Sequence, residues 1–356
     1  MARITLRLSS SGELFRNFAL LTLSGFGTRA LGFITVLVLA RRLGAGSFGQ
    51  LNFAQALIAY FILMADFGTS TLGIRELAAR RDAIRNEVSR FLFARLGTGA
   101  FASVLLVMTA ILLPRPASDR LLILIFGLSV IATVFTVEWV FRAVERMGVV
   151  AAGSLIGTLV SLGLVLLFVN EQTSILIVPF FLAAGAFARV VFYWGMLLRD
   201  YGGVQLTSSW QQVGGTLNRA ITLGLAYLMI QIYYNIDTLL LGFYRSNEEV
   251  GWYNAAYRLV LAFTALAGIV GDVIFPRLSR LSQSAGGSEH GPIMVLGAKV
   301  LLYLALPVAL GGTLFGEGII FVLYGAGYVN SAPVLRVIIW QAFTVFCNVS
   351  FAYYLL

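Results

Sequence analysis

Charged side chains stand inside long apolar stretches of this 356-residue chain. The cations are Arg29, Arg95, Arg189, Arg258, Lys299 and Arg336, and the acids are Asp66, Glu138, Asp237 and Asp272. A charge within a membrane-spanning helix costs about 2.5–3.5 kcal/mol on insertion scales, so such groups usually pair, face a bundle interior or mark a transport path. These residues therefore predict that an anion is bound, or a cation relayed, at membrane depth.

Arg29 is the strongest candidate for a binding residue. It stands near the middle of the first apolar run, too deep to reach either membrane surface easily. Its guanidinium stays charged and presents paired N–H donors that match phosphate oxygens. We expect it to bind an anionic headgroup in a water-filled cavity. The alternative is a buried ion pair with Asp66 or Asp237, and the two roles can coexist.

A second polar stretch leads up to Arg258 and contains Trp252, Tyr253, Asn254 and Tyr257. Aromatic rings stack on sugars and an amide offers both a donor and an acceptor, so this face suits a sugar or a phosphate. An interfacial aromatic belt explains the Trp and Tyr residues equally well. Five further polar residues are binding candidates, with interhelical hydrogen bonding as the alternative: Asn17, Asn52, Gln55, Gln231 and Asn235.

Few residues could couple transport to an ion or bind a cofactor. Four acids are candidates for proton or sodium coupling, or for ion pairing: Asp66, Asp237, Glu138 and Asp272. The single histidine, His290, lies in a Ser/Gly-rich loop, and the single cysteine, Cys347, lies in an apolar run. This composition excludes a disulfide and a CxxC redox pair and argues against histidine catalysis. We expect no metal, no organic cofactor and no enzymatic activity.

Membrane-spanning helices must carry these residues. Only 12% of the chain is charged and 59% is hydrophobic, whereas a soluble domain has about 25% charged residues. A membrane barrel needs short alternating segments, but residues 121–137 are apolar on every side. The sequence predicts an all-α polytopic membrane protein with ten spans, at 14–40, 51–73, 91–113, 121–142, 149–169, 175–198, 219–243, 251–275, 293–314 and 333–356.

The arginines are distributed unevenly between the two sides of the membrane. Fourteen fall in alternate loops on one side and five on the other, which predicts a cytoplasmic N-terminus at residues 1–13. The net charge of +9 thus reflects membrane topology, and no nucleic-acid partner is expected. Residues 74–90 combine apolar positions at helical spacing with five arginines. They predict an amphipathic helix on the cytoplasmic leaflet, or a topology anchor without further role.

An internal repeat organises the chain. A shift of 202 residues places Gly49 on Gly251 and Asn52 on Asn254, and it also places the first three spans on the seventh to ninth. The offset joins helices of equal parity, so the halves are related by an axis along the membrane normal. We expect a lobe at 14–200, a linker at 201–215 and a second lobe at 216–356. The repeat also predicts about two more helices beyond residue 356.

Three motifs carry a resemblance to a known family. They are LARRLGAGSFG at 39–49, DFG at 66–68 and EVGWYNAAYR at 249–258. With them the chain resembles the polysaccharide transporter (oligosaccharide flippase) family, to which O-antigen and exopolysaccharide flippases belong, within the multidrug/oligosaccharidyl-lipid/polysaccharide exporter superfamily. The resemblance implies two pseudo-symmetric lobes around a central cavity, the second lobe being incomplete here. The family's cavity cations correspond by position to Arg29 and Arg258.

The resemblance also implies a function and a location. Family members move polyprenyl-pyrophosphate-linked oligosaccharides to the outer leaflet of the bacterial cytoplasmic membrane by alternating access, for surface polysaccharides such as lipopolysaccharide O-antigen. The expected partners are membrane lipid, the lipid-linked oligosaccharide, a polysaccharide polymerase and chain-length machinery. One alternative is a cation-coupled multidrug exporter, which would favour an acid-lined cavity. A more distant one is a membrane-embedded glycan polymerase or acyltransferase.

Overall fold

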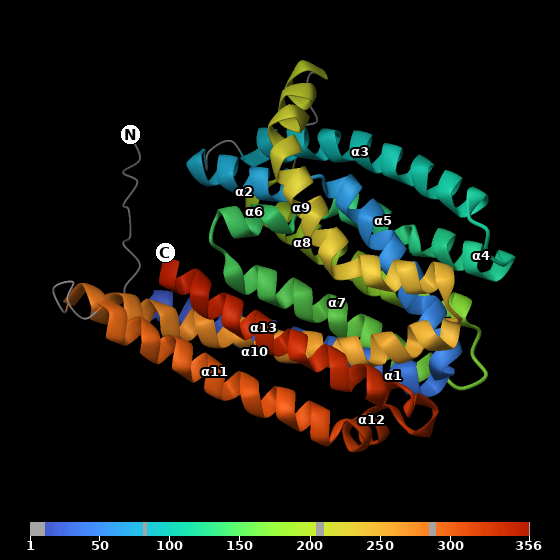
Figure 1. The fold of residues 1–356 in the computed structure, drawn as a ribbon. Helices are drawn as coiled ribbons and strands as arrows, with labels where there is room; N and C mark the ends of the chain where they lie inside the picture. Colours follow the sequence, from blue (N-terminus) through green and yellow to red (C-terminus); the bar gives the residue numbers. More distant parts are fainter. Residues whose placement is uncertain (1–10, 81–83, 204–209, 285–289, 356) are drawn as a thin grey trace, which may run out of the picture. The chain divides into compact units, whose positions relative to one another are not determined.

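The computed structural model describes residues 11–80, 84–203, 210–284 and 290–355, with side chains over 25–80, 84–203, 211–265 and 301–348 and at Lys299. Within these ranges every regular element is a helix (Figure 1). The elements are α1 (Ser11–Asp66), α2 (Thr69–Ala79), α3 (Ile84–Leu112), α4 (Ala117–Phe126), α5 (Leu128–Phe135), α6 (Glu138–Ala143), α7 (Met147–Phe168), η2 (Ile175–Ile177), α8 (Val178–Tyr201), α9 (Trp210–Tyr244), α10 (Asn247–Ser284), α11 (His290–Leu314), α12 (Gly316–Tyr324), η3 (Ala326–Tyr328) and α13 (Ser331–Leu355).

Helix length and composition confirm a multi-pass membrane protein. In the described residues seven helices are long and apolar enough to cross a membrane, or eight if the bent pair Leu301–Leu314 and Gly316–Tyr324 is one span. The stretch Gly25–Ala79 counts once in that number. A straight helix as long as α1 would reach about 84 Å, nearly three times the apolar thickness of a bilayer. Gly44 interrupts α1 with φ 74° and ψ 169°, so α1 carries both the first and the second predicted span.

Two predicted helix boundaries were wrong, and one predicted span contains internal breaks. The span predicted at 121–142 corresponds to the candidate span Ala117–Ala143, which is divided into α4, α5 and α6 by breaks at Gly127 and at 136–137. The second span ends at Asp66 rather than at residue 73, because Phe67 and Gly68 adopt positive φ angles of 41° and 78°. Residues 316–324, predicted as loop, form α12, which is bent by 79° from the preceding helical segment.

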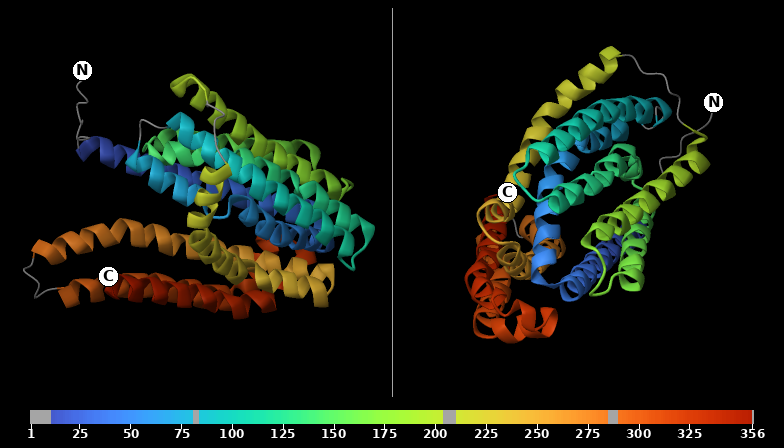
Figure 2. Two further views of the ribbon diagram at one scale, coloured as in Figure 1. Left: turned by 90° about the horizontal axis from the view of Figure 1, so that it is seen from above. Right: turned by 90° about the vertical axis from the view of Figure 1, so that its right-hand side faces the viewer.

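The first compact unit comprises Met1–Val38 and Phe53–Leu240. Its α7 and α8 pack side by side (Figure 2), and a Cβ atom on Gly185 would lie 2.3 Å from the carbonyl oxygen of Gly157. Small residues therefore allow these two helices to pack closely here. The loop before α7 is tied to the end of α8 by Arg146, whose hydrogen bond with Asp200 raises the pKa of Arg146.

The connector at 74–90 packs into the core of this unit. Leu77, Ile84 and Val88 are buried in one cluster with Trp139, and Gly73 approaches the Trp139 ring so closely that a Cβ atom there would clash. The prediction of a continuous helix with its apolar face on the leaflet was therefore wrong. The apolar positions were identified correctly, but protein side chains cover them instead of lipid.

The second compact unit comprises Leu39–Asn52 and Leu241–Leu356. Helices α10, α11 and α13 run side by side in it (Figure 2). Gly49 of α1 lies against the backbone of Asn247, and Gly251 of α10 lies against the backbone of Ala45. Both pairs are related by the 202-residue shift, so the two repeats cross through equivalent contacts. The division into lobes at residues 200 and 216 stays a prediction.

Candidate functional site

A polar cluster in the second unit surrounds Arg258 of α10. Its Nη2 donates a hydrogen bond to Oδ1 of Asn52 at 3.0 Å. Tyr257 and Tyr324 lie close enough to interact electrostatically with the guanidinium. We define the Arg258 cluster as Asn52, Asn254, Tyr257, Arg258 and Tyr324. Apart from Arg258, which is partly buried, every member is at most 5% exposed.

The two asparagines of the cluster occupy equivalent positions in the repeat. Asn52 donates through Nδ2 to the carbonyl of Phe48 at 2.8 Å, and Asn254 donates in the same way to the carbonyl of Val250 at 2.9 Å. Arg258 has no such counterpart, because the position 202 residues earlier is Ala56. The repeat therefore supplies a symmetric amide pair, and a single arginine makes the site asymmetric.

A hydroxyl with no described partner completes the cluster. The Oη atom of Tyr324 is buried and makes no hydrogen bond to a residue that the structure describes. Tyr324 ends α12, a helix fixed by Arg41, which donates through Nε to the carbonyl of Leu323 at 2.7 Å and through Nη2 to that of Val322. Tyr328 follows, and its hydroxyl donates to the carbonyl of Ala40 at 2.8 Å. Arg41, in the motif at 39–49, therefore holds α12 in place and with it Tyr324.

Asp66 belongs to a different cluster, in the first unit. The side chain of Arg95 is 1% exposed, and its Nη2 lies 2.8 Å from Oδ1 of Asp66. Arg95 also donates to Oγ1 of Thr69, Oγ of Ser70 and the carbonyl of Thr136. These bonds join the end of α1 to α2, α3 and the break after α5. The ion pair considered between Arg29 and Asp66 is therefore replaced by an Arg95–Asp66 pair.

The other predicted residues lie outside these two clusters. Arg29 is exposed on α1 in the first unit. Asn235 donates to the backbone carbonyl of Gln231 at 3.2 Å, and Asp237 accepts from the backbone N–H of Thr238 at 2.6 Å.

Four further predicted positions remain. Glu138 pairs with Arg142 at 2.6 Å on the same helix, and Gln55 is half-buried in the first unit. The side chains of Asn17 and Asp272 lie outside the described residues. In the described part of the chain no group of three or more His, Cys, Asp or Glu side chains could hold a metal ion.

The sequence did not identify Tyr324 and Arg41 as site residues. Tyr324 lies in a segment predicted as loop, and Arg41 is one of the five arginines counted on the less basic side of the membrane. A signal for Arg41 was present, because it stands in the motif at 39–49 that carries the family resemblance. Tyr324 gave no such signal, because its place beside Arg258 depends on the bend before α12.

Comparisons with known proteins agree with this architecture. Residues 14–282 match the family described as "Polysaccharide biosynthesis protein". The "Putative O-antigen transporter" of Escherichia coli (strain K12) is 24% identical over 335 residues, which are 92% of this chain and 79% of the relative. The "Probable flippase AglR" of Haloferax volcanii is 34% identical over 90 residues, which are 25% of this chain and 19% of the relative.

A solved structure shares the fold. It is titled "Inward-facing conformation of a multidrug resistance MATE family transporter of the MOP superfamily" and has a TM-score of 0.65 at 12% identity, covering 92% of this chain and 83% of that one. At such low identity the likeness shows the fold alone. The family match covers most of the chain, and the predicted resemblance is confirmed: the chain belongs to the polysaccharide biosynthesis protein family.

Proposed function

We propose that the chain is a flippase that moves a polyprenyl-pyrophosphate-linked oligosaccharide from the inner to the outer leaflet of a bacterial cytoplasmic membrane, for surface polysaccharide synthesis. Family membership supports a role in polysaccharide export, and the names of the relatives point to O-antigen transport and flipping. The N-terminus would be cytoplasmic, and a polysaccharide polymerase with its chain-length machinery would receive the product.

The observation that carries the proposal is the Arg258 cluster. A permanently charged guanidinium stands within an apolar helical unit. It is held by the amide oxygen of Asn52 and lies near the hydroxyl of Tyr324, which has no partner among the described residues. Cations at such depth usually mark a transport path. Guanidinium N–H groups match phosphate oxygens in geometry and charge, so a pyrophosphate is the ligand that this group suits best.

Each part of the substrate has a proposed location. The pyrophosphate would bind Arg258, with Arg29 as a separate second candidate in the first unit. The sugars would contact Asn254 and the stacked rings of Tyr253 and Tyr257, whose centroids are 5.7 Å apart. The lipid tail would remain in the bilayer. No covalent bond changes, so net movement requires a gradient or removal of the product, because equal affinity in both states shifts nothing.

Binding of the lipid-linked substrate tests the role of Arg258. The purified chain in nanodiscs would be titrated with a polyprenyl-pyrophosphate oligosaccharide and its occupancy measured by native mass spectrometry. We expect Arg258→Gln to weaken binding at least about 30-fold, because a desolvated charge contact with phosphate is lost.

The matched control for this titration is Arg336→Gln in the same unit. Its side chain is 45% exposed and pairs with Glu317, so its removal should leave binding unchanged. A polyprenol without phosphate should bind equally to all three proteins. Wild-type affinity in Arg258→Gln would contradict the assignment.

A further inference from the structure

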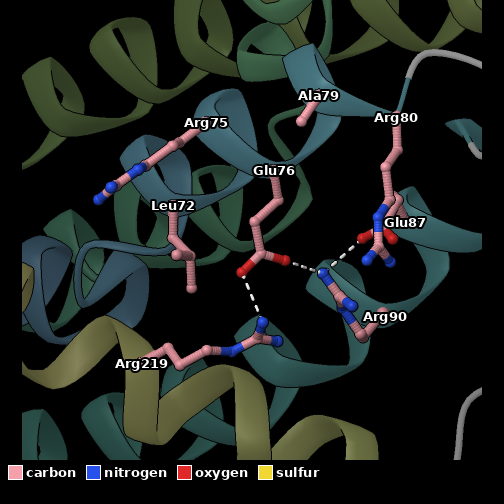
Figure 3. Close-up of a pocket in the computed structure, with 8 residues that line it drawn as sticks. All are labelled: Leu72, Arg75, Glu76, Ala79, Arg80, Glu87, Arg90 and Arg219. Carbon is pink, nitrogen blue, oxygen red and sulfur yellow. Dashed lines mark hydrogen bonds and ion pairs between the residues drawn. The ribbon is translucent and has the colours of Figure 1, made fainter.

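A pocket in the first unit opens where α2, α3 and α9 meet (Figure 3). It has a volume of about 520 Å³. Its polar lining consists of four arginines and two glutamates, namely Arg75, Arg80, Arg90, Arg219, Glu76 and Glu87. It shares no residue with the Arg258 cluster, so its ligand can be identified without a transport assay.

The two carboxylates of the pocket are committed to two of the arginines. Figure 3 shows Glu76 between Arg90 and Arg219: its Oε1 lies 2.9 Å from Nη1 of Arg219, and its Oε2 pairs with Arg90. Glu87 also pairs with Arg90, at 2.5 Å. These ion pairs fix the guanidinium groups of α3 and α9 on either side of the Glu76 carboxylate.

The other two arginines, Arg75 and Arg80, have no such partner among the described residues. Arg75 and Arg80 are exposed and make no ion pair with any residue in the described part of the chain. The Nε atom of Arg90 is buried and likewise has no hydrogen-bond partner among the described residues. Four arginines against two glutamates leave the pocket with a net charge of +2, together with donors that no described residue satisfies.

We propose that this pocket binds a phosphate group. A phosphate monoester carries a charge of about −1.5 to −2 at pH 7 and presents several strong acceptor oxygens, which complements both the charge excess and the unsatisfied donors. Guanidinium groups bind phosphate in paired geometry. The phosphate belongs either to the headgroup of an anionic membrane lipid or to free inorganic phosphate. The same lining residues would bind it in both cases.

The predicted topology places the pocket at the cytoplasmic end of the helices, where anionic lipids attract basic segments. A bound headgroup would join α2, α3 and α9 through their arginines. It would thereby fix the start of α9, the helix that follows the predicted linker at 201–215. A phosphate-bearing lipid thus becomes a ligand that holds this end of the first unit together.

The test compares two probes on the full chain in nanodiscs of neutral phosphatidylcholine. One series receives increasing amounts of phosphatidic acid in the bilayer, and the other receives inorganic phosphate in the buffer. Native mass spectrometry measures the retained lipid, and the shift in thermal unfolding midpoint measures the effect of free phosphate. We expect Arg75→Gln combined with Arg80→Gln to weaken binding about 30-fold.

Two further variants make the test specific. Glu76→Gln raises the charge of the pocket to +3, so it should bind the same probe several-fold more tightly even if its unfolding midpoint falls. Arg199→Gln removes an exposed arginine on the same predicted side but outside the pocket, and it should bind as wild type does. Response to phosphatidic acid alone identifies a lipid site, and response to both probes identifies a site for free phosphate as well. The proposal would be overturned if the Arg75→Gln/Arg80→Gln double variant bound both probes as tightly as Arg199→Gln does.

Discussion

Arg95 and Arg258 both lie in predicted membrane spans, but their surroundings differ. We infer from this difference that Arg95 has a structural role and Arg258 a functional one. The described contacts of Arg95 use all three guanidinium nitrogens, on a carboxylate, two hydroxyls and a carbonyl. Arg258 donates a hydrogen bond to the neutral amide of Asn52 and stands near a buried tyrosine hydroxyl that has no described partner. We propose that Arg258 is the arginine that binds an anion. Arg95 instead holds the protein together.

Replacing Arg95 tests this division at the residue scale. Arg95→Leu should lower the free energy of unfolding by about 3–5 kcal/mol, because it leaves the charge of Asp66 without its partner. Adding Asp66→Asn should recover much of the loss, because the uncompensated charge is then removed. Denaturant-induced unfolding in micelles, followed by circular dichroism, measures both effects.

Arg142→Gln is the control for that experiment. Its side chain is 48% exposed and pairs with Glu138 on the same helix, and such exposed pairs contribute less than about 1 kcal/mol. Equal losses for Arg95→Leu and Arg142→Gln would show that the buried network contributes nothing special to stability.

At the scale of elements, the crossing of α1 and α10 depends on two glycines. A Cβ atom on Gly49 would lie 1.8 Å from the carbonyl oxygen of Asn247, and one on Gly251 would lie 2.0 Å from that of Ala45. Gly49→Ala and Gly251→Ala should each lower the free energy of unfolding by about 1–3 kcal/mol, since the helices must move apart. Thermal unfolding of the purified variants checks this.

Gly32→Ala provides the comparison for these two variants. A Cβ atom on Gly32 of α1 meets no atom within 4 Å, so alanine should be neutral or should stabilise the helix by up to about 1 kcal/mol through its higher propensity. If Gly49→Ala behaved like Gly32→Ala, the close crossing of the two repeats would be refuted.

The helices could be predicted from the sequence, but their interruptions could not. Hydropathy locates spans because lipid requires about 20 apolar residues in a row. The break at Thr136 depends on Arg95, which donates to its carbonyl from another helix. The short α12 depends on Arg41, 282 residues away from the Leu323 carbonyl that it binds. Contacts of this kind leave no periodic signal near the residues they affect.

The candidate site was predictable to a similar extent. Charge within an apolar run was sufficient to select Arg258, and the repeat aligned Asn52 with Asn254. The pairing of Arg258 with Asn52, 206 residues apart, requires the crossing of α1 and α10. Asp66 was selected by the same charge criterion, yet its partner proved to be Arg95 rather than Arg29, because α3 lies between α2 and the break after α5.

For the molecule as a whole, the arginine asymmetry predicts which loops face the cytoplasm. In a Cys347→Ala background, which has no cysteine, an impermeant maleimide added to intact cells should label Asn170→Cys and Arg245→Cys. It should label Arg80→Cys and Arg199→Cys only after the membrane is opened. The reverse pattern would invert the proposed orientation.

The central claim is that the chain carries a lipid-linked oligosaccharide across a membrane. The most direct measurement reconstitutes the chain into liposomes that hold such a lipid in both leaflets and adds a glycosidase outside. We predict that the digestible fraction rises beyond the outer-leaflet share for the wild type, and stays at that share for Arg258→Gln. Wild-type liposomes that digest no further than protein-free liposomes would contradict the account.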